Sequence, residues 1–249
     1  MGREVIMRFG YIKGMGQTAP TPFHLPIESH PHLLLTGGSG SGKSYALFNI
    51  ISDVVLSENN LKLYLADFKN SSDFRYLEGY PFYYHGDSAY EGIMQYYESF
   101  TKARQNGNNT KRHILIIDEY PSLISYMTLK DKTDKTKKAN DILSAIGEIL
   151  MQGRGLNFGI WLTTQRADAS LFANGSRDNF HVIIALGNLS KEQKSMLFSD
   201  IEIPSKIYQQ GEGIILANGF GVKEIIFPYM KNLPEWKRNI RKILLKKSS

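Results

Sequence analysis

The sequence predicts an α/β protein in which a mostly parallel sheet is flanked by helices. Short apolar runs alternate with amphipathic patterns of helix length along most of the chain. One apolar run leads through a glycine-rich segment into a helical pattern, and another ends in two adjacent acids. This alternation is typical of strand–helix units that build a parallel sheet with helices on its faces.

The apolar runs predict the strands, and apolar residues spaced three and four apart predict the helices. The expected strands are 32–36, 62–66, 113–117, 158–163 and 181–186, with a β-ribbon at 213–226 that would close one edge of the sheet. The expected helices are 43–57, 88–105, 138–152, 190–199 and 234–246. Two polar stretches, Arg104–Arg112 and the mixed-charge Leu129–Asp141, are expected to be solvated loops, and the alternative for the second is a dedicated binding role.

Composition narrows the class of protein. The 249 residues include no cysteine, which excludes disulfides, thiolate metal sites and cysteine nucleophiles, and favours a cytoplasmic location. No apolar run approaches the roughly 20 residues that a membrane-spanning helix needs, so no membrane span is expected. The net charge of +6 suits a polyanionic partner. Lys237–Lys247 is rich in basic residues and contains no acid, which fits either a solvated helix end or a contact with DNA or another partner.

The strongest local pattern is a phosphate-binding loop between an expected strand and an expected helix. It follows G-x-x-x-x-G-K-S and consists of Gly37, Gly38, Ser39, Gly40, Ser41, Gly42, Lys43 and Ser44. Glycines let backbone N–H groups wrap phosphates, and the helix N-terminus adds its positive dipole end. Lys43 is predicted to reach the β- and γ-phosphates of ATP, and Ser44 to offer its hydroxyl to Mg²⁺.

Two acids follow the apolar run Ile114–Ile117. A strand buried on both faces does not accommodate carboxylates, so Asp118 and Glu119 are expected at its carboxyl end, in the crevice where open α/β sheets bind ligands. We predict that Asp118 holds Mg²⁺ through its water shell and that Glu119 is the general base for the attacking water. A third polar site follows the next strand, where Gln165 is expected near the γ-phosphate as a sensor or water-positioning group.

Several ordered segments together resemble the FtsK/HerA family of DNA-pumping ATPases, and specifically the FtsK/SpoIIIE motor. They are HPHLLLTGGSGSGKSYAL, LADFKNSSDFRYLEGYP, ILIIDEYPSL, QGRGLNFGIWLTTQRAD and NFHVIIALGNLSKEQKSML, between about His30 and Tyr229. The chain departs from the family pattern at Ala167, where proline is usual, and in a charged insert between Tyr126 and Ile142. It is expected to carry the motor alone, without a membrane segment or a winged-helix domain.

The resemblance implies a RecA-like P-loop core acting as a hexameric ring with duplex DNA in its pore. It implies residues 1–30 as an N-terminal strand and lead-in, 31–230 as the motor and 231–249 as a basic C-terminal helix. By position it places Arg166, Lys191 and Lys194 on the DNA phosphates. It makes Arg154, beside the helix-breaking Gly153 and Gly155, an arginine finger for a neighbouring subunit's ATP.

The expected function is therefore ATP-driven translocation of double-stranded DNA, for a mobile element or plasmid. Two alternatives use the same chemistry. One is a viral genome-packaging ATPase, and the other is a protein-secretion ATPase of the type VII kind. A single domain with a basic tail favours a DNA substrate over a protein substrate.

Overall fold

The structure is a computed structural model that describes residues 4–12, 19–107, 109–166, 177–198 and 201–248. Its strands form one sheet in the order β2-β1-β10-β9-β8-β3-β7-β6-β4-β5. The strands are β1 (Ile6–Ile12), β2 (Thr21–Pro26), β3 (Leu33–Gly37), β4 (Leu61–Asp67), β5 (Tyr83–His85), β6 (Arg112–Ile117), β7 (Phe158–Thr164), β8 (Val182–Leu186), β9 (Glu212–Ala217) and β10 (Gly221–Ile226).

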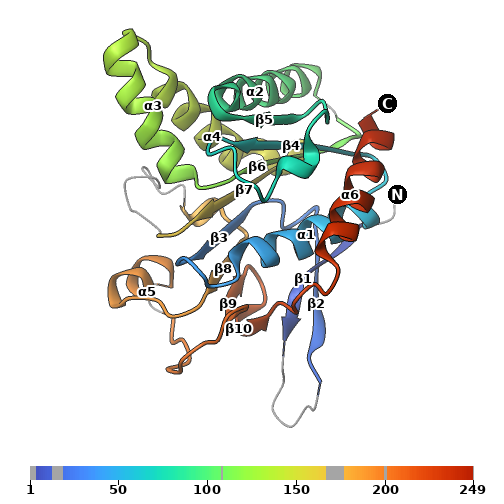
Figure 1. The fold of residues 1–249 in the computed structure, drawn as a ribbon, viewed down its shortest axis with the longest axis vertical. Coiled ribbons are helices and arrows are strands. Elements are labelled where there is room, and N and C mark those ends of the chain that lie inside the picture. Colours follow the sequence, from blue (N-terminus) through green and yellow to red (C-terminus); the bar gives the residue numbers. More distant parts are fainter. Residues whose placement is uncertain (1–3, 13–18, 108, 167–176, 199–200, 249) are drawn as a thin grey trace.

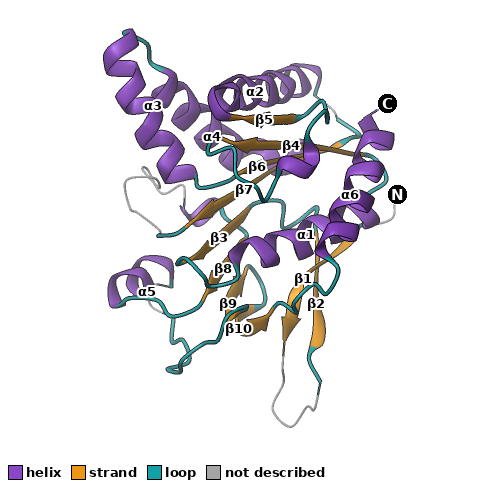
Figure 2. Ribbon diagram, viewed as in Figure 1, coloured by secondary structure: helices purple, strands orange, loops and turns teal. Residues whose placement is uncertain are grey.

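Six neighbouring strands, from β5 to β8 in the sheet order, are parallel, and the other pairings are antiparallel. The helices are α1 (Lys43–Ser57), α2 (Ala89–Asn106), α3 (Tyr120–Asp134), α4 (Lys138–Gln152), α5 (Lys191–Leu197) and α6 (Leu233–Ser248). They lie on both sides of the sheet (Figure 1; Figure 2). The expected α/β class with a mostly parallel sheet is confirmed.

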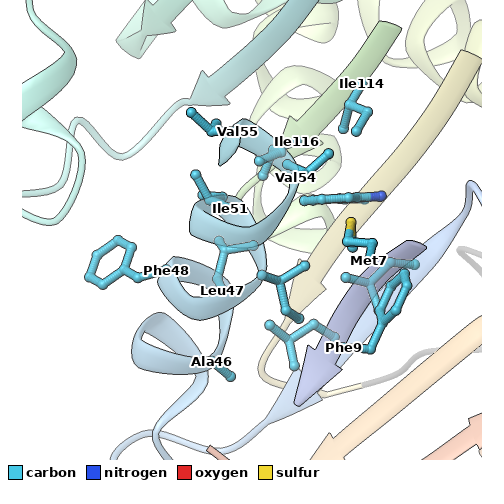
Figure 3. Close-up of a cluster of buried hydrophobic side chains, with 14 of the residues drawn as sticks. Met7, Phe9, Ala46, Leu47, Phe48, Ile51, Val54, Val55, Ile114 and Ile116 are labelled. Atoms are coloured by element: carbon cyan, nitrogen blue, oxygen red, sulfur yellow. The ribbon is translucent and has the colours of Figure 1, made fainter. Parts of the chain in front are cut away.

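Two hydrophobic clusters, one on each face of the sheet, hold the helices against it. In β6, Ile114 and Ile116 belong to the cluster under α1 and α6, whereas Leu115 and Ile117 belong to the cluster under α2 and α4. Figure 3 shows the first cluster, where α1 packs on one face of the sheet against Met7 and Phe9 of β1 and against Ile114 and Ile116 of β6. Because both faces are covered, the central strands are buried along their whole length, and polar side chains concentrate at the strand ends.

The β-ribbon formed by β9 and β10 was expected to close an edge, and that prediction is wrong. The ribbon lies inside the sheet, because β1 pairs with β10 on its far side and β2 then forms the edge. The N-terminal hairpin therefore covers a strand edge that would otherwise be exposed for pairing. The hairpin and the C-terminal α6 share one hydrophobic cluster with α1.

The expected loop at Leu129–Asp141 is also wrong, because most of it is helical. Helix α3 continues through the charged residues to Asp134, and α4 begins at Lys138 after a short turn. The Asp131 carboxylate accepts hydrogen bonds from the backbone N–H groups of Lys138 and Ala139, at 2.9 and 2.8 Å. A side chain from the end of α3 thus satisfies the first donors of α4, which have no partner within their own helix. The other expected loop is shorter than predicted, since α2 extends to Asn106.

Helix α6 carries the basic C-terminal stretch on an amphipathic scaffold. Ile240 and Leu244 are buried, while the Lys237 ammonium lies 5.3 Å from the centre of the Phe48 ring. Arg241 donates a hydrogen bond to the carbonyl of Glu78, and Lys247 donates one to the carbonyl of Glu58. Part of the basic stretch therefore anchors α6 to the domain. In the part of the chain that the structure describes, no helix is both long and apolar enough to cross a membrane.

Candidate nucleotide-binding site

The candidate site lies at the carboxyl ends of β3, β7 and β6, which are adjacent and parallel. The phosphate-binding loop leaves β3 and enters α1, whose first residue is Lys43. Gly42 adopts a φ of +95°, and a Cβ atom at this position would come within 2.8 Å of the Gly211 backbone nitrogen. The loop therefore requires glycine here for both its backbone conformation and its close packing.

The end of β6 places its acids beside this loop. The Lys43 ammonium contacts Glu119 Oε1 at 2.9 Å, and both side chains are mostly buried. Glu119 has φ 52° and ψ 50°, a left-handed conformation that costs a non-glycine residue roughly 1–3 kcal/mol. Such strain persists when surrounding contacts determine the conformation, and here the ion pair on the side chain is one such contact.

Thr163, near the end of β7, connects both acids. Its hydroxyl donates a hydrogen bond to Asp118 Oδ1 at 2.6 Å and accepts one from the Glu119 backbone N–H at 2.9 Å. One side chain thus sets the position of the candidate metal ligand and of the candidate base. No role was predicted for Thr163 from the sequence, although it stands two residues before Gln165, at the end of the same strand.

Two further polar residues from the end of β4 reach the site. The Lys69 ammonium lies 3.9 Å from Glu119 Oε2, and the buried Asp67 accepts a hydrogen bond from the Ser71 backbone N–H at 2.7 Å. Asp67 Oδ1 is buried and has no hydrogen-bond partner in the described part of the structure. The Asp-Phe-Lys sequence after an expected strand was the signal for these two residues, but sequence reasoning gave them no role.

Comparisons with known proteins support the nucleotide-binding reading. The sequence model of the FtsK/SpoIIIE family matches residues 14–119, which include the phosphate-binding loop and both acids. Over 202 residues the chain is 28% identical to the FtsK domain-containing protein YdcQ of Bacillus subtilis, a match covering 72% of this chain and 40% of YdcQ. The matched segment, residues 14–119, therefore resembles the P-loop ATPase domain of the FtsK/SpoIIIE family.

Several solved structures share this fold. The pCW3 conjugation coupling protein TcpA aligns with a TM-score of 0.76 and 18% identity, over 100% of this chain and 72% of TcpA. ATPases 2 and 3 of EssC from Geobacillus thermodenitrificans align with a TM-score of 0.71 and 13% identity, over 98% of this chain and 49% of the EssC chain. These similarities concern the fold, and the chain spans less than half the length of both YdcQ and the EssC chain.

The remaining predicted site residues fall into two groups. Gln165 and Arg166 are exposed directly after β7, and Lys191 and Lys194 lie on α5, which follows β8. Since β7 and β8 flank β3, these residues lie at the same edge of the sheet as the phosphate-binding loop.

Arg154 lies at the opposite side of the sheet, where the parallel strands begin. It is exposed in a 3₁₀ turn that directly precedes β7, and its charge acts on His181 at the start of β8. Burial and then the positive charge of Arg154 lower the pKa of His181 to about 4. Seven residues of β7, roughly 20 Å of extended chain, separate this turn from the carboxyl edge. Arg154 therefore does not reach the phosphate-binding loop of its own chain.

The residues at the carboxyl edge fit a magnesium ion. The Ser44 hydroxyl and the Asp118 carboxylate are oxygen donors of the kind that Mg²⁺ prefers. Burial raises the pKa of Asp118 to about 6, with the hydrogen bond from Thr163 opposing the shift and the nearby Glu119 adding to it. A divalent cation would offset this concentration of negative charge.

The raised pKa predicts a pH dependence. Mg²⁺ binds the ionised carboxylate, so the Mg²⁺ concentration needed for half-maximal ATP hydrolysis should rise as the pH falls through about 6. Asp118 has a higher pKa in the folded protein than its value near 3.9 in the unfolded chain, so folding favours the protonated form. The contribution of Asp118 to stability therefore declines as the pH rises from about 3.9 to about 6.

Thr163→Val removes a hydrogen bond to the ionised form of Asp118 and should move the midpoint of the Mg²⁺ requirement to higher pH.

The matched control is Thr164→Val, because the Thr164 hydroxyl bonds to the backbone of Arg166 and not to Asp118. Its midpoint should match that of the wild type. A Mg²⁺ requirement that stays constant between about pH 5 and pH 8 would contradict the assignment of Asp118 as the titrating group.

Proposed function

We propose that this domain hydrolyses ATP to translocate double-stranded DNA, acting as a hexameric ring in the transfer or replication of a mobile element. The observation that carries the proposal is the gathering of two kinds of residue at one sheet edge. Lys43, Asp118 and Glu119 supply the chemistry of ATP hydrolysis. Exposed cationic side chains follow the two strands that flank the phosphate-binding loop.

In the proposed reaction, Glu119 accepts a proton from a water molecule whose oxygen attacks the γ-phosphorus of ATP. The bond from the γ-phosphorus to the bridging oxygen breaks, and ADP leaves with the bond's electron pair. Lys43 binds the β- and γ-phosphate oxygens, so ATP binding exchanges its contact with Glu119 for contacts with phosphate. The freed carboxylate is then available to orient the water, while Gln165 provides a second polar contact near the γ-phosphate.

Ser44 and Asp118 would hold Mg²⁺, which would supply positive charge to the phosphate oxygens. The Thr163 hydroxyl keeps the Asp118 carboxylate aimed at this position, and its contact with the Glu119 backbone fixes the distance between the two acids. Proper spacing matters because phosphoryl transfer depends mainly on positioning and electrostatics.

Two substitutions separate nucleotide binding from hydrolysis. Lys43→Ala removes a phosphate contact and should weaken ATP binding and abolish turnover. Glu119→Gln keeps the size of the side chain but removes the base, so it should bind ATP while hydrolysing it at least about a hundredfold more slowly. ATP binding and steady-state phosphate release measure the two effects. Near wild-type turnover of Glu119→Gln would remove Glu119 from the mechanism.

Arg166, Lys191 and Lys194 are proposed to bind the phosphate backbone of DNA. A motor must hold every sequence that it passes, which requires contacts with phosphates and not with base edges. Arg166 and Lys191 are exposed, and Lys194 is half-buried. Ser190 caps α5 through a hydrogen bond from the Gln193 backbone N–H, which holds the two lysines on a short ordered helix.

Lys191→Ala combined with Lys194→Ala should reduce the stimulation of ATP hydrolysis by duplex DNA. Each lost phosphate contact should also flatten the slope of log affinity against log salt by roughly 0.9. Lys132→Ala combined with Lys135→Ala removes the same charge from exposed positions around the end of α3 and serves as the matched control. An unchanged salt slope in the Lys191 and Lys194 variant would exclude these lysines from the DNA contact.

Arg154 is proposed to act on the ATP of the adjacent subunit. Its place at the amino edge of the sheet separates it from its own phosphate-binding loop, and a ring brings different edges of neighbouring subunits together. A guanidinium supplied in this way offsets charge that develops on the γ-phosphate, and its removal costs roughly a thousandfold or more in turnover.

Arg154→Ala should therefore fold and bind ATP but be nearly inactive. Mixed with the inactive Glu119→Gln protein, it should recover part of the activity, because some interfaces then combine an intact base with an intact arginine. Phosphate release by each variant alone, at the same total concentration, is the reference. Normal turnover of Arg154→Ala would contradict the role, and mixtures no more active than the separate variants would contradict action between subunits.

A further inference from the structure

An exposed aromatic side chain, that of Tyr229, packs against the first turn of the helix that follows the phosphate-binding loop. Tyr45 directly follows Ser44 in the first turn of α1, and its ring stacks on that of Tyr229, with centroids 5.1 Å apart and planes inclined by 29°. Tyr229 lies in the segment that leaves β10 and runs along α1 toward α6 (Figure 1). It is 73% exposed, so most of a large aromatic surface faces solvent.

Hydrogen bonds tie the Tyr229 segment to the phosphate-binding loop. The Gly211 backbone N–H donates to the Ser41 carbonyl at 2.8 Å, and the Phe227 backbone N–H donates to the Gly211 carbonyl at 2.8 Å. Phe227, two residues before Tyr229, is therefore linked through Gly211 to Ser41 of the loop.

Asn49 provides a second link between Tyr45 and the segment that carries Tyr229. Its side-chain amide donates to the carbonyl of Tyr45 at 2.9 Å and to the carbonyl of Pro228 at 3.5 Å. Asn49 is buried, so this bridge is shielded from water. The two tyrosines are therefore held both to each other and to the loop, which gives the aromatic surface a set position relative to bound phosphates.

We propose that the Tyr229 ring, supported from behind by Tyr45, is the surface on which the base of the bound nucleotide stacks. This inference rests on the proposed binding of ATP and assigns the recognition of its base. Tyr45 directly follows Lys43 and Ser44, so the phosphates of a nucleotide held by the loop would lie next to the stacked tyrosines. Stacking of a base on an aromatic side chain contributes about 1–3 kcal/mol.

A purely structural role accounts less well for Tyr229. An aromatic residue that serves packing is buried on both faces, as Phe48 is beneath Tyr45. Tyr229 instead uses one face to stack on Tyr45. A tyrosine also loses little conformational freedom when it binds, because its side chain has only two rotatable torsions, and the stack with Tyr45 already restricts them.

The test compares a ligand that has a base with one that has none. ATP and inorganic tripolyphosphate, both with Mg²⁺, are titrated against the wild type, Tyr229→Ala, Tyr229→Phe and the control Phe220→Ala. Phe220 is another exposed aromatic residue, but it contacts Phe23 and His30 and not the phosphate-binding loop. Tyr229→Ala should weaken ATP binding roughly tenfold or more and leave tripolyphosphate binding unchanged. Tyr229→Phe and Phe220→Ala should bind both ligands as the wild type does.

Two results would overturn the inference. One is an unchanged affinity of Tyr229→Ala for ATP, and the other is an equal loss for ATP and tripolyphosphate, which would show damage to the phosphate-binding loop. Tyr45→Ala provides a second variant and should also weaken ATP more than tripolyphosphate. If the wild type bound neither ligand, the proposed function itself would fail, whereas a wild type that binds both together with an indifferent Tyr229→Ala would exclude only the stacking role.

Discussion

The parallel pairing of β6, β7, β3 and β8 is the constraint on which the rest of the structure depends. Helices cover both faces of these strands, so their interiors are apolar and their polar residues stand at the ends. Parallel pairing then brings several carboxyl ends to one edge. Lys43, Asp118, Glu119 and Gln165 come from different parts of the sequence and follow three adjacent strands at that edge. The same constraint puts Arg154 before the start of β7, away from the phosphate-binding loop of its own chain, which is why the role proposed for it involves a second subunit.

Electrostatic balance at the carboxyl edge explains why the site suits a metal-bound triphosphate. Asp67, Asp118 and Glu119 lie close to Lys43 and Lys69, and burial raises the pKa of both aspartates. The acids therefore carry more negative charge than the two lysines offset in a site with little water. In the proposed reaction, a divalent cation would add to the positive side, and the phosphates of ATP would draw Lys43 away from Glu119. Nucleotide and metal binding would then rearrange one set of charges instead of adding independent contacts.

Local patterns were sufficient to predict much of the fold and of the candidate site. Helix α1 and helix α4 begin and end at the predicted residues, because each has a clear apolar stripe bounded by glycine or polar residues. Helix α3 was not predicted at all, and its charged end was expected to be a loop because it has no apolar stripe. The turn after α3 is stabilised by Asp131 of the same helix, a contact that no local pattern reveals. The place of the β-ribbon depends on pairing with the distant N-terminal β1, which no local pattern reveals.

Residues of the site that act through neighbours were the hardest to find in the sequence. Thr163 and Lys69 reach Glu119 only because β4, β6 and β7 are adjacent in the sheet, and the stack of Tyr229 on Tyr45 joins residues almost two hundred positions apart. Their roles follow from strand order and from loop hydrogen bonds, which become visible only in three dimensions.

ATP hydrolysis is proposed to move the protein along double-stranded DNA. A duplex carrying a third strand bound in its major groove tests this directly, because a translocating motor displaces the third strand as it passes. The wild type should release the third strand when ATP and Mg²⁺ are present, and Glu119→Gln should not. Active ATP hydrolysis without displacement, at salt concentrations where the protein binds the duplex, would contradict translocation.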